Sequence, residues 1–453
     1  MVRIKSNHTI LPSEPTPKGR LWLSKCDQLI HPRTYTPTIY IYKPQHRNHT
    51  TSCSVIERMR DSLSKTLVHY YPLAGRLRCI GRKQYEVDCN EMGVTLLEAE
   101  SDKILDEYDD FAPDSSIREL IPKIDFGEPI EKLPFLFVQV TRFSCGSFSV
   151  GFASSHMVMD GVSATDFVKS WAKLARGYKL NKEETPSLDR MALQSQELRM
   201  VQAPRFRHRE FEPLPLILSQ SDNTEERNKE TSIELLKFTK EEVEKLKIKV
   251  NQATKVQEIV GQHGRPYSKF EALSAHIWRC VTKARRPDNL QPTVVWTVGD
   301  IRNRLNPPLP GNYFGNAVFP TVTPECLSGD IISKTLSYAA EKVRESIETL
   351  TDEYIRSQFD FLTSDQLHKF GSVQDHFLGN PNLTIGCWTG IPIFEADFGW
   401  GKPIYVGLGA LDGDGSTFII PTSAGDGSLI VAICLQKTHM KAFKMLFYED
   451  LEN

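Results

Sequence analysis

The amino-acid sequence predicts an α/β protein with two domains, each built on a mixed sheet flanked by helices. Segments that alternate like strands are interleaved with segments of helical periodicity, which is the pattern of a mixed α/β fold. The chain has 453 residues, more than one hydrophobic core usually serves. A hydrophobic fraction of 40% and a charged fraction of 25% are typical of a globular protein. We therefore expect two folded domains rather than a disordered chain.

An irregular stretch divides the chain near its middle. Residues 191–231 contain several prolines followed by a charged run, which predicts a crossover linker. The expected domains are residues 1–190 and 232–453. About residues 375–400 are expected to pack on the N-terminal domain although they belong to the C-terminal half.

A hairpin and a helix are predicted around one histidine in the N-terminal half. Alternation over residues 135–143 and 148–152, with a short polar break between them, predicts two paired strands. Ser163 is expected to cap the helix that follows, and Gly177 is expected to end it. His156 should therefore lie in a strand-to-helix loop.

The C-terminal half repeats the alternation of helices and strands. Helices are predicted after the caps Thr239 and Ser268 and over residues 332–347, where apolar residues recur at helical spacing. Strands are predicted at Thr293–Val298, Thr384–Trp388, Tyr405–Leu408, Thr417–Pro421 and Leu429–Cys434.

Composition excludes several functional classes. A formal net charge of -2 argues against nucleic acid as the main partner. The sequence shows neither a signal peptide nor an apolar stretch of membrane-spanning length, so we expect a cytoplasmic protein. Its nine cysteines are scattered without a Cys-x-x-Cys pair, so neither a disulfide framework nor a thiolate metal site is expected. No other metal site is predicted.

The segment His156–Gly161 is an H-x-x-x-D-G motif between a strand and a helix. An imidazole with a pKa near ~6.5 accepts a proton at neutral pH, so His156 is a candidate general base. Asp160 could orient it as in a hydrolase triad, and a buried structural histidine is the other interpretation. The sequence has no Gly-x-Ser-x-Gly elbow and no recognisable cysteine nucleophile. Direct group transfer without a covalent acyl-enzyme fits better.

A second motif, D-F-G-W-G, covers Asp397–Gly401. Glycines on both sides of a tryptophan predict a tight loop whose backbone approaches another group closely. The alternative is an aromatic plug that closes a core.

The two motifs, in this order, resemble the signature of the BAHD family of acyl-CoA-dependent acyltransferases. Further blocks similar to the family are Tyr71–Arg76, Phe270–Arg279, Asp300–Arg304 and Tyr313–Asn316. The resemblance implies a monomer of two chloramphenicol-acetyltransferase-like domains, with the active-site channel between them and His156 at its centre. Acyl-CoA would be a co-substrate, with no permanently bound cofactor.

The resemblance also assigns roles to single residues. Asp160 would be structural and pair with an arginine, either Arg302 or Arg304. The loop at Asp397 would be structural too, whereas Trp400 would help to hold the tetrahedral intermediate. Ser268 and Arg302 lie in blocks that the family places near CoA.

The segment Thr36–Tyr40 resembles the hydroxycinnamoyltransferases of the family. Thr36 would lie beside the reacting carbonyl, and Thr38 and Tyr40 would bind the acyl group. An ordinary β-strand explains Thr38 and Tyr40 equally well.

The acceptor is predicted from a wider resemblance, which includes Pro12–Pro17 and Phe447–Asp450, to the spermidine hydroxycinnamoyl transferases, which form phenolamides. Gly390 stands where shikimate- and quinate-using relatives carry an arginine. A polyamine needs carboxylates along its chain, and the candidates are Asp375, Glu395 and Asp414. We therefore predict transfer from hydroxycinnamoyl-CoA to the amines of spermidine, giving amides and free CoA.

Three alternatives remain open at this point. The first is an O-acyltransferase that acts on shikimate, quinate or another alcohol. The second is a condensation domain of a peptide synthetase, although Ser155 stands where a second histidine is expected. The third is a binding module without activity.

Overall fold

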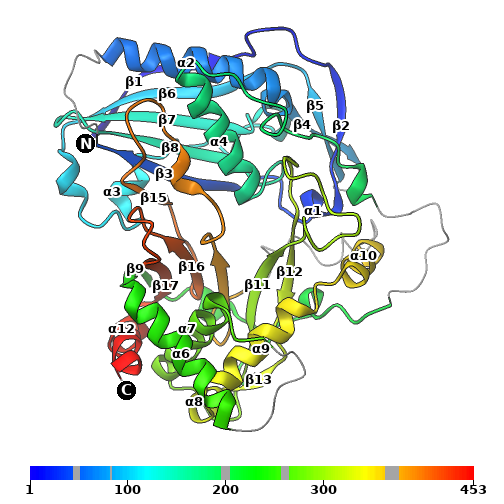
Figure 1. Ribbon diagram of the computed structural model, residues 1–453, viewed down its shortest axis with the longest axis vertical. Helices are drawn as coiled ribbons and strands as arrows, with labels where there is room; N and C mark the ends of the chain where they lie inside the picture. Colours follow the sequence, from blue (N-terminus) through cyan, green and yellow to red (C-terminus); the bar gives the residue numbers. More distant parts are fainter. Residues whose placement is uncertain (44–51, 82–83, 195–204, 257–264, 363–376, 453) are drawn as a thin grey trace.

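The computed structural model describes residues 1–43, 52–81, 84–194, 205–256, 265–362 and 377–452. It has two halves, each built around a six-stranded sheet with helices packed against it (Figure 1). Both sheets mix parallel and antiparallel pairs. This confirms the predicted α/β class.

The first sheet has the strand order β1-β6-β7-β8-β3-β15. Its strands are β1 (Val2–Ile10), β6 (Val94–Ser101), β7 (Leu136–Phe143), β8 (Phe148–Ser155), β3 (Tyr35–Tyr42) and β15 (Tyr405–Leu408). The helices α2 (Ser52–His69) and α4 (Gly161–Ala175) lie side by side across one face (Figure 1). A small sheet of β2 (Gly19–Trp22), β5 (Gln84–Cys89) and β4 (Arg76–Gly81) flanks it.

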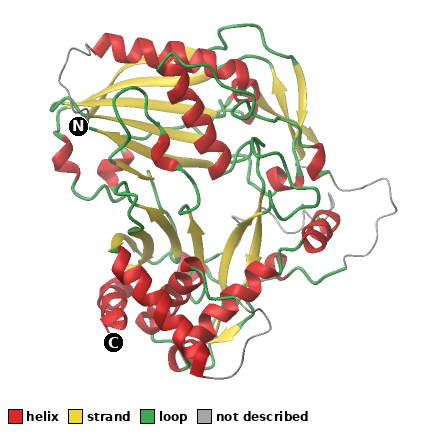
Figure 2. Ribbon diagram, in the orientation of Figure 1, coloured by secondary structure: helices red, strands yellow, loops and turns green. Residues whose placement is uncertain are grey.

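The second sheet has the order β12-β11-β14-β16-β17-β9. Its strands are β12 (Val318–Val322), β11 (Val295–Asp300), β14 (Leu383–Cys387), β16 (Ser416–Pro421), β17 (Leu429–Gln436) and β9 (Thr231–Phe238). The helices that pack on it are α6 (Lys240–Val256), α7 (Lys269–Arg285), α9 (Leu336–Glu348) and α12 (Lys437–Glu452). These helices gather on the side of the sheet away from the first half (Figure 2). The other face of this sheet adds Leu235, Ile420 and Ile430 to the first hydrophobic core.

Shorter elements connect these layers. The helices are α1 (Lys25–Gln28), α3 (Ser115–Arg118), α5 (Thr224–Arg227), α8 (Ser328–Ser333) and α10 (Asp352–Phe361), and β10 (Pro292–Thr293) pairs with β13 (Cys326–Leu327). None of the helices in the described part of the chain has the length and apolarity needed to cross a membrane.

One strand of the first sheet comes from the C-terminal half of the chain. β15 pairs with β3, with Val406 opposite Tyr40. Residues from Ile393 to Leu411 belong to the first hydrophobic core, whereas β14 stays in the second sheet. The expected packing of about residues 375–400 on the N-terminal domain stays a prediction.

The predicted hairpin is present, because β7 and β8 pair antiparallel directly before His156. The predicted helix cap is wrong. Asp160, not Ser163, caps α4, and its side chain accepts a hydrogen bond from the Ser163 backbone N–H at 3.0 Å. The Ser163 hydroxyl is instead engaged by Gly315, whose N–H donates to it at 3.0 Å. α4 ends at Ala175, and Gly177 follows with a positive φ of 83°.

Candidate active site

His156 lies in the loop between β8 and α4, where its side chain lines a cavity of about 150 Å³. Trp388 follows β14 and Phe418 lies on β16, so side chains of the second half complete the cavity wall. The other lining residues are Thr36, Thr38, Tyr40, Leu136, Phe152, Ser154, Met159, Asp160, Gly161, Ala164, Thr165, Phe167, Val168, Ile391, Ile393 and Val406. The cavity is mostly apolar, which suits an acyl group with an aromatic ring.

The three acyl-pocket candidates on β3 face this cavity together. Thr36, Thr38 and Tyr40 alternate along the strand, so their side chains share one face of the sheet. β3 pairs with β8, with Thr36 opposite Ser154, so the row starts near His156 and leads away from it. Burial raises the pKa of the Tyr40 phenol, which keeps it a neutral hydrogen-bonding group. Binding of an acyl group by these three residues stays a prediction.

Asp160 makes an ion pair with Arg302, and the carboxylate accepts bonds on both oxygens. Oδ1 accepts from Arg302 Nη2 at 2.9 Å, and Oδ2 accepts from the Ala317 backbone N–H at 2.9 Å. Burial lowers the pKa of the Arg302 guanidinium, but Asp160 raises it above its usual value. The second predicted partner, Arg304, donates to the carbonyls of Ile347 and Leu350 instead. Both oxygens of the Asp160 carboxylate thus accept hydrogen bonds from residues of the second half.

Arg302 lies in the pair with Asp160. Its side chain is only 7% exposed, and it donates to Asp160, Asp300 and Ser163. The predicted contact of Arg302 with CoA stays a prediction. Ser268 is exposed and caps α7, where its hydroxyl accepts from the Glu271 N–H. Its contact with CoA stays a prediction.

The D-F-G-W-G loop closes the first core at a distance from His156. Asp397 Oδ1 accepts from the backbone N–H groups of Gly399 and Gly401, at 2.7 and 3.0 Å. Trp400 packs edge-on against Phe148, with ring centroids 4.3 Å apart. Phe148 begins β8 and His156 follows its end, roughly 25 Å away at about 3.3 Å per residue. The predicted role of Trp400 at the tetrahedral intermediate is therefore corrected to a packing role.

The structure does not bring the two described candidates for polyamine-binding carboxylates, Glu395 and Asp414, to His156. Glu395 is exposed and pairs with Lys402 at 2.7 Å. Asp414 is buried and pairs with Arg285 at 2.9 Å in the second half. Asp375 lies outside the described residues. Among the described residues that line the cavity, the only carboxylate is that of Asp160, which Arg302 neutralises.

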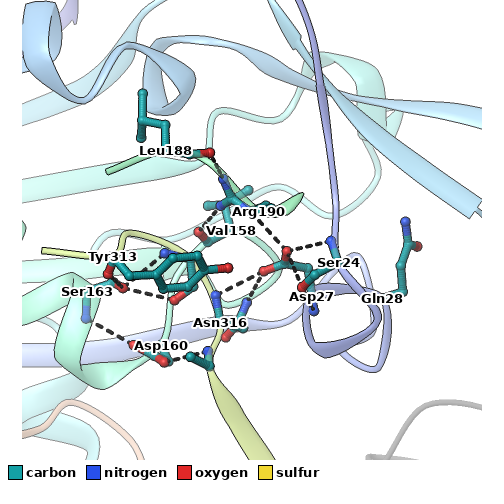
Figure 3. Close-up of polar contacts among 12 residues, drawn as sticks. Ser24, Asp27, Gln28, Val158, Asp160, Ser163, Leu188, Arg190, Tyr313 and Asn316 are labelled. Atoms are coloured by element: carbon teal, nitrogen blue, oxygen red, sulfur yellow. Dashed lines mark hydrogen bonds and ion pairs between the residues drawn. The ribbon is translucent and has the colours of Figure 1, made fainter. Parts of the chain in front are cut away.

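Three residues that contact or support the histidine loop were not predicted from the sequence. Asn316 donates to the His156 carbonyl at 2.8 Å. Asp27 accepts from Asn316 and pairs with Arg190 (Figure 3). Asn316 lies in the block Tyr313–Asn316 that resembles the family, which was the available signal. Asp27 forms a local capping box with Ser24, but the contacts of Asp27 with Asn316 and Arg190 gave no local signal, because these partners are distant in sequence.

The chain belongs to the Transferase family, the family of BAHD acyl-CoA-dependent acyltransferases, whose model matches residues 1–450. It is 44% identical to a hydroxycinnamoyl-CoA:piscidic acid hydroxycinnamoyltransferase from Actaea racemosa over 100% of both chains. It is 36% identical to a shikimate O-hydroxycinnamoyltransferase from Nicotiana tabacum over 99% of both. The fold is similar to vinorine synthase, with a TM-score of 0.73, 21% identity and coverage of 98% and 96% of the two chains.

These findings confirm the predicted family, fold class and enzyme class. The protein is an acyl-CoA-dependent acyltransferase, with acyl-CoA as co-substrate. Neither relative named above has a polyamine in its name. The spermidine part of the prediction is therefore without support from them.

Proposed function

We propose that this enzyme transfers a hydroxycinnamoyl group from its CoA thioester to a hydroxyl of a small acceptor, with His156 as the general base. The observation that carries the proposal is the cavity between the two halves. His156 lines this cavity together with apolar and aromatic side chains and with the hydroxyl side chains of β3. The described lining residues include no free carboxylate. The names of the two relatives support a hydroxycinnamoyl-CoA donor.

The reaction is direct transfer. His156 takes the proton of the acceptor hydroxyl as its oxygen bonds to the thioester carbonyl carbon, which gives a tetrahedral intermediate. The carbon–sulfur bond then breaks, the ester forms, and the proton passes from the imidazolium to the CoA sulfur. Because no acyl-enzyme is needed, much of the rate must come from holding both substrates against His156.

The charge of the cavity favours a hydroxyl acceptor over spermidine. Each ammonium group buried without a carboxylate would cost several kcal/mol. An alkylammonium with a pKa near ~10.4 must also lose a proton before it can attack, whereas a neutral hydroxyl needs only the base. Shikimate and piscidic acid are candidates because they are the acceptors named for the two relatives, and each carries a carboxylate for which the described lining residues supply no lysine or arginine. Amide formation on spermidine is the competing function.

An acceptor assay separates these functions. The purified enzyme is incubated with coumaroyl-CoA and, in separate reactions, shikimate, piscidic acid or spermidine, and products are identified by mass. We expect an ester of one of the two acids and no amide. Amide from spermidine alone would overturn the proposal and return the acceptor to a polyamine.

A further inference from the structure

The backbone of His156 is held by hydrogen bonds on both sides of its Cα atom. Its N–H donates to the Thr34 carbonyl at 2.9 Å, and its carbonyl accepts from Asn316 Nδ2 at 2.8 Å. Thr34 belongs to the first half and Asn316 to the loop before β12 in the second half. The direction of the Cα–Cβ bond of His156, and hence the aim of its imidazole, depends on both contacts.

Asn316 is itself fixed by a buried carboxylate. Its backbone N–H and its Nδ2 both donate to Asp27 Oδ1, at 3.0 and 2.8 Å (Figure 3). The other oxygen of Asp27 accepts from the N–H and the hydroxyl of Ser24, both at 2.8 Å. The Asp27 side chain is fully buried. Asn316 therefore has one defined orientation.

Arg190 completes the arrangement from a third segment. Its Nε donates to Asp27 Oδ2 at 3.0 Å, and its Nη2 donates to the Val158 carbonyl at 3.1 Å. A Cβ at Gly315 would lie 3.0 Å from Arg190 Nη2, so a glycine before Asn316 leaves room for the guanidinium. One buried ion pair thus reaches the histidine loop at two carbonyls, those of His156 and Val158.

Stability alone is a weak explanation for this pair. A buried ion pair costs so much desolvation that apolar residues of similar volume often serve as well or better. Arg190 contacts the histidine loop directly, and Asp27 contacts it through Asn316. The pair is therefore placed to fix the geometry of the loop that carries His156. Another ion pair of similar burial, Arg285–Asp414, lies in the second half, and neither of its residues lines the His156 cavity.

We propose that Asp27, Arg190 and Asn316 are positioning residues for His156, which we call the Asp27 clamp. The clamp holds the loop at the His156 and Val158 carbonyls so that the imidazole meets the acceptor hydroxyl at the thioester. The inference rests on the general-base role of His156 in the proposed function. Its Asp27–Asn316 bonds join the two halves, as the Asp160–Arg302 pair does.

The test compares two buried asparagines with the same chemistry. Asn316→Ala removes the donor to the His156 carbonyl. The control Asn382→Ala removes an equally buried amide, whose Nδ2 donates to the Pro215 carbonyl at 2.8 Å away from the cavity. We expect N316A to lower kcat at least about tenfold while KM for coumaroyl-CoA stays within about threefold, because only transition-state geometry is lost. N382A should keep kcat within about twofold of wild type, even if its Tm falls as much as that of N316A.

A second pair of variants keeps the charge and changes only the geometry. Arg190→Lys cannot donate to Asp27 and Val158 at once, so kcat should fall, whereas Arg285→Lys in the second half should leave it unchanged. Equal kcat losses in each matched pair, or kcat within about twofold of wild type in both N316A and R190K, would overturn the clamp.

His156→Ala in the same series separates the two proposals. If H156A keeps turnover, the general-base role fails. If H156A is inactive and N316A behaves like N382A, only the clamp fails.

Discussion

Gly386 and Phe418 are direct partners in the second sheet, and the missing side chain of Gly386 makes room for the phenylalanine ring. They pair across the parallel strands β14 and β16. A Cβ at Gly386 would lie only 2.6 Å from the Phe418 ring. The ring packs edge-on against Trp388, with centroids 5.6 Å apart, and both line the His156 cavity. Gly386 therefore sets the position of the aromatic wall opposite β3.

Gly386→Ala should displace this wall and impair catalysis. The added methyl group forces the Phe418 ring to move, which changes the shape of the cavity where the substrates meet. We expect kcat/KM to fall about tenfold, since a misplacement of about 1 Å is costly to reaction geometry. Gly311→Ala is the control, because a Cβ there has no atom within 4 Å and Gly311 does not line the His156 cavity. Unchanged kinetics in G386A would show that the ring moves without consequence.

Breaking the Asp160–Arg302 pair should destabilise the protein. Arg302→Met leaves the Asp160 carboxylate buried without its cation, which typically costs about 3–5 kcal/mol. Asp300→Asn is the control, since Asp300 also contacts Arg302 but is 46% exposed. Its loss should cost less than about 1 kcal/mol. Urea unfolding measures both, and an R302M variant within about 1 kcal/mol of wild type would contradict a stabilising pair.

Local patterns and distant contacts explain which parts of the site the sequence predicted. The hairpin and the loop of His156 follow from alternation within a few residues, so they could be predicted. The cap of α4 was assigned to the wrong residue: Asp160 caps it through a local bond from the Ser163 N–H, while the Ser163 hydroxyl is engaged by Gly315, 152 residues away. The clamp was missed because Asp27 and Asn316 are 289 residues apart. The role of Trp400 at the intermediate was implied by the family resemblance alone, whereas its packing against Phe148 matches the aromatic plug, the other interpretation of the motif.

Acid should weaken the protein partly through His276, which is buried on α7 against Phe447. Its Nε2 donates to the Phe447 carbonyl at 2.9 Å, and burial lowers its pKa to about 4. In the unfolded chain this pKa is about 6.5, so between these values the unfolded state binds more protons. The contribution of neutral His276 to the free energy of unfolding is therefore fully present above pH 6.5 and is lost as the pH falls toward 4. At pH 5 the loss should be roughly 2 kcal/mol.

His276→Gln should remove this part of the pH dependence. The variant can be less stable at every pH, so the measured quantity is the difference in unfolding free energy between pH 7 and pH 5. That difference should shrink by roughly 2 kcal/mol relative to wild type. His31→Gln, at an exposed position, should leave it unchanged. An undiminished difference in H276Q would assign the acid sensitivity to other groups.

His156→Ala should remove turnover and spare the binding of CoA. A general base contributes about 10²- to 10⁴-fold to the rate, so kcat should fall by that range. The imidazole lies in the cavity between the halves, beside the β3 row and the Trp388–Phe418 wall, so it should act on the reacting centre rather than on the nucleotide. Calorimetric titration of CoA should therefore give a Kd close to wild type, and His31→Gln should match wild type in both assays. Loss of CoA binding together with activity would mean that His156 holds the donor, and the proton transfer would then need another base.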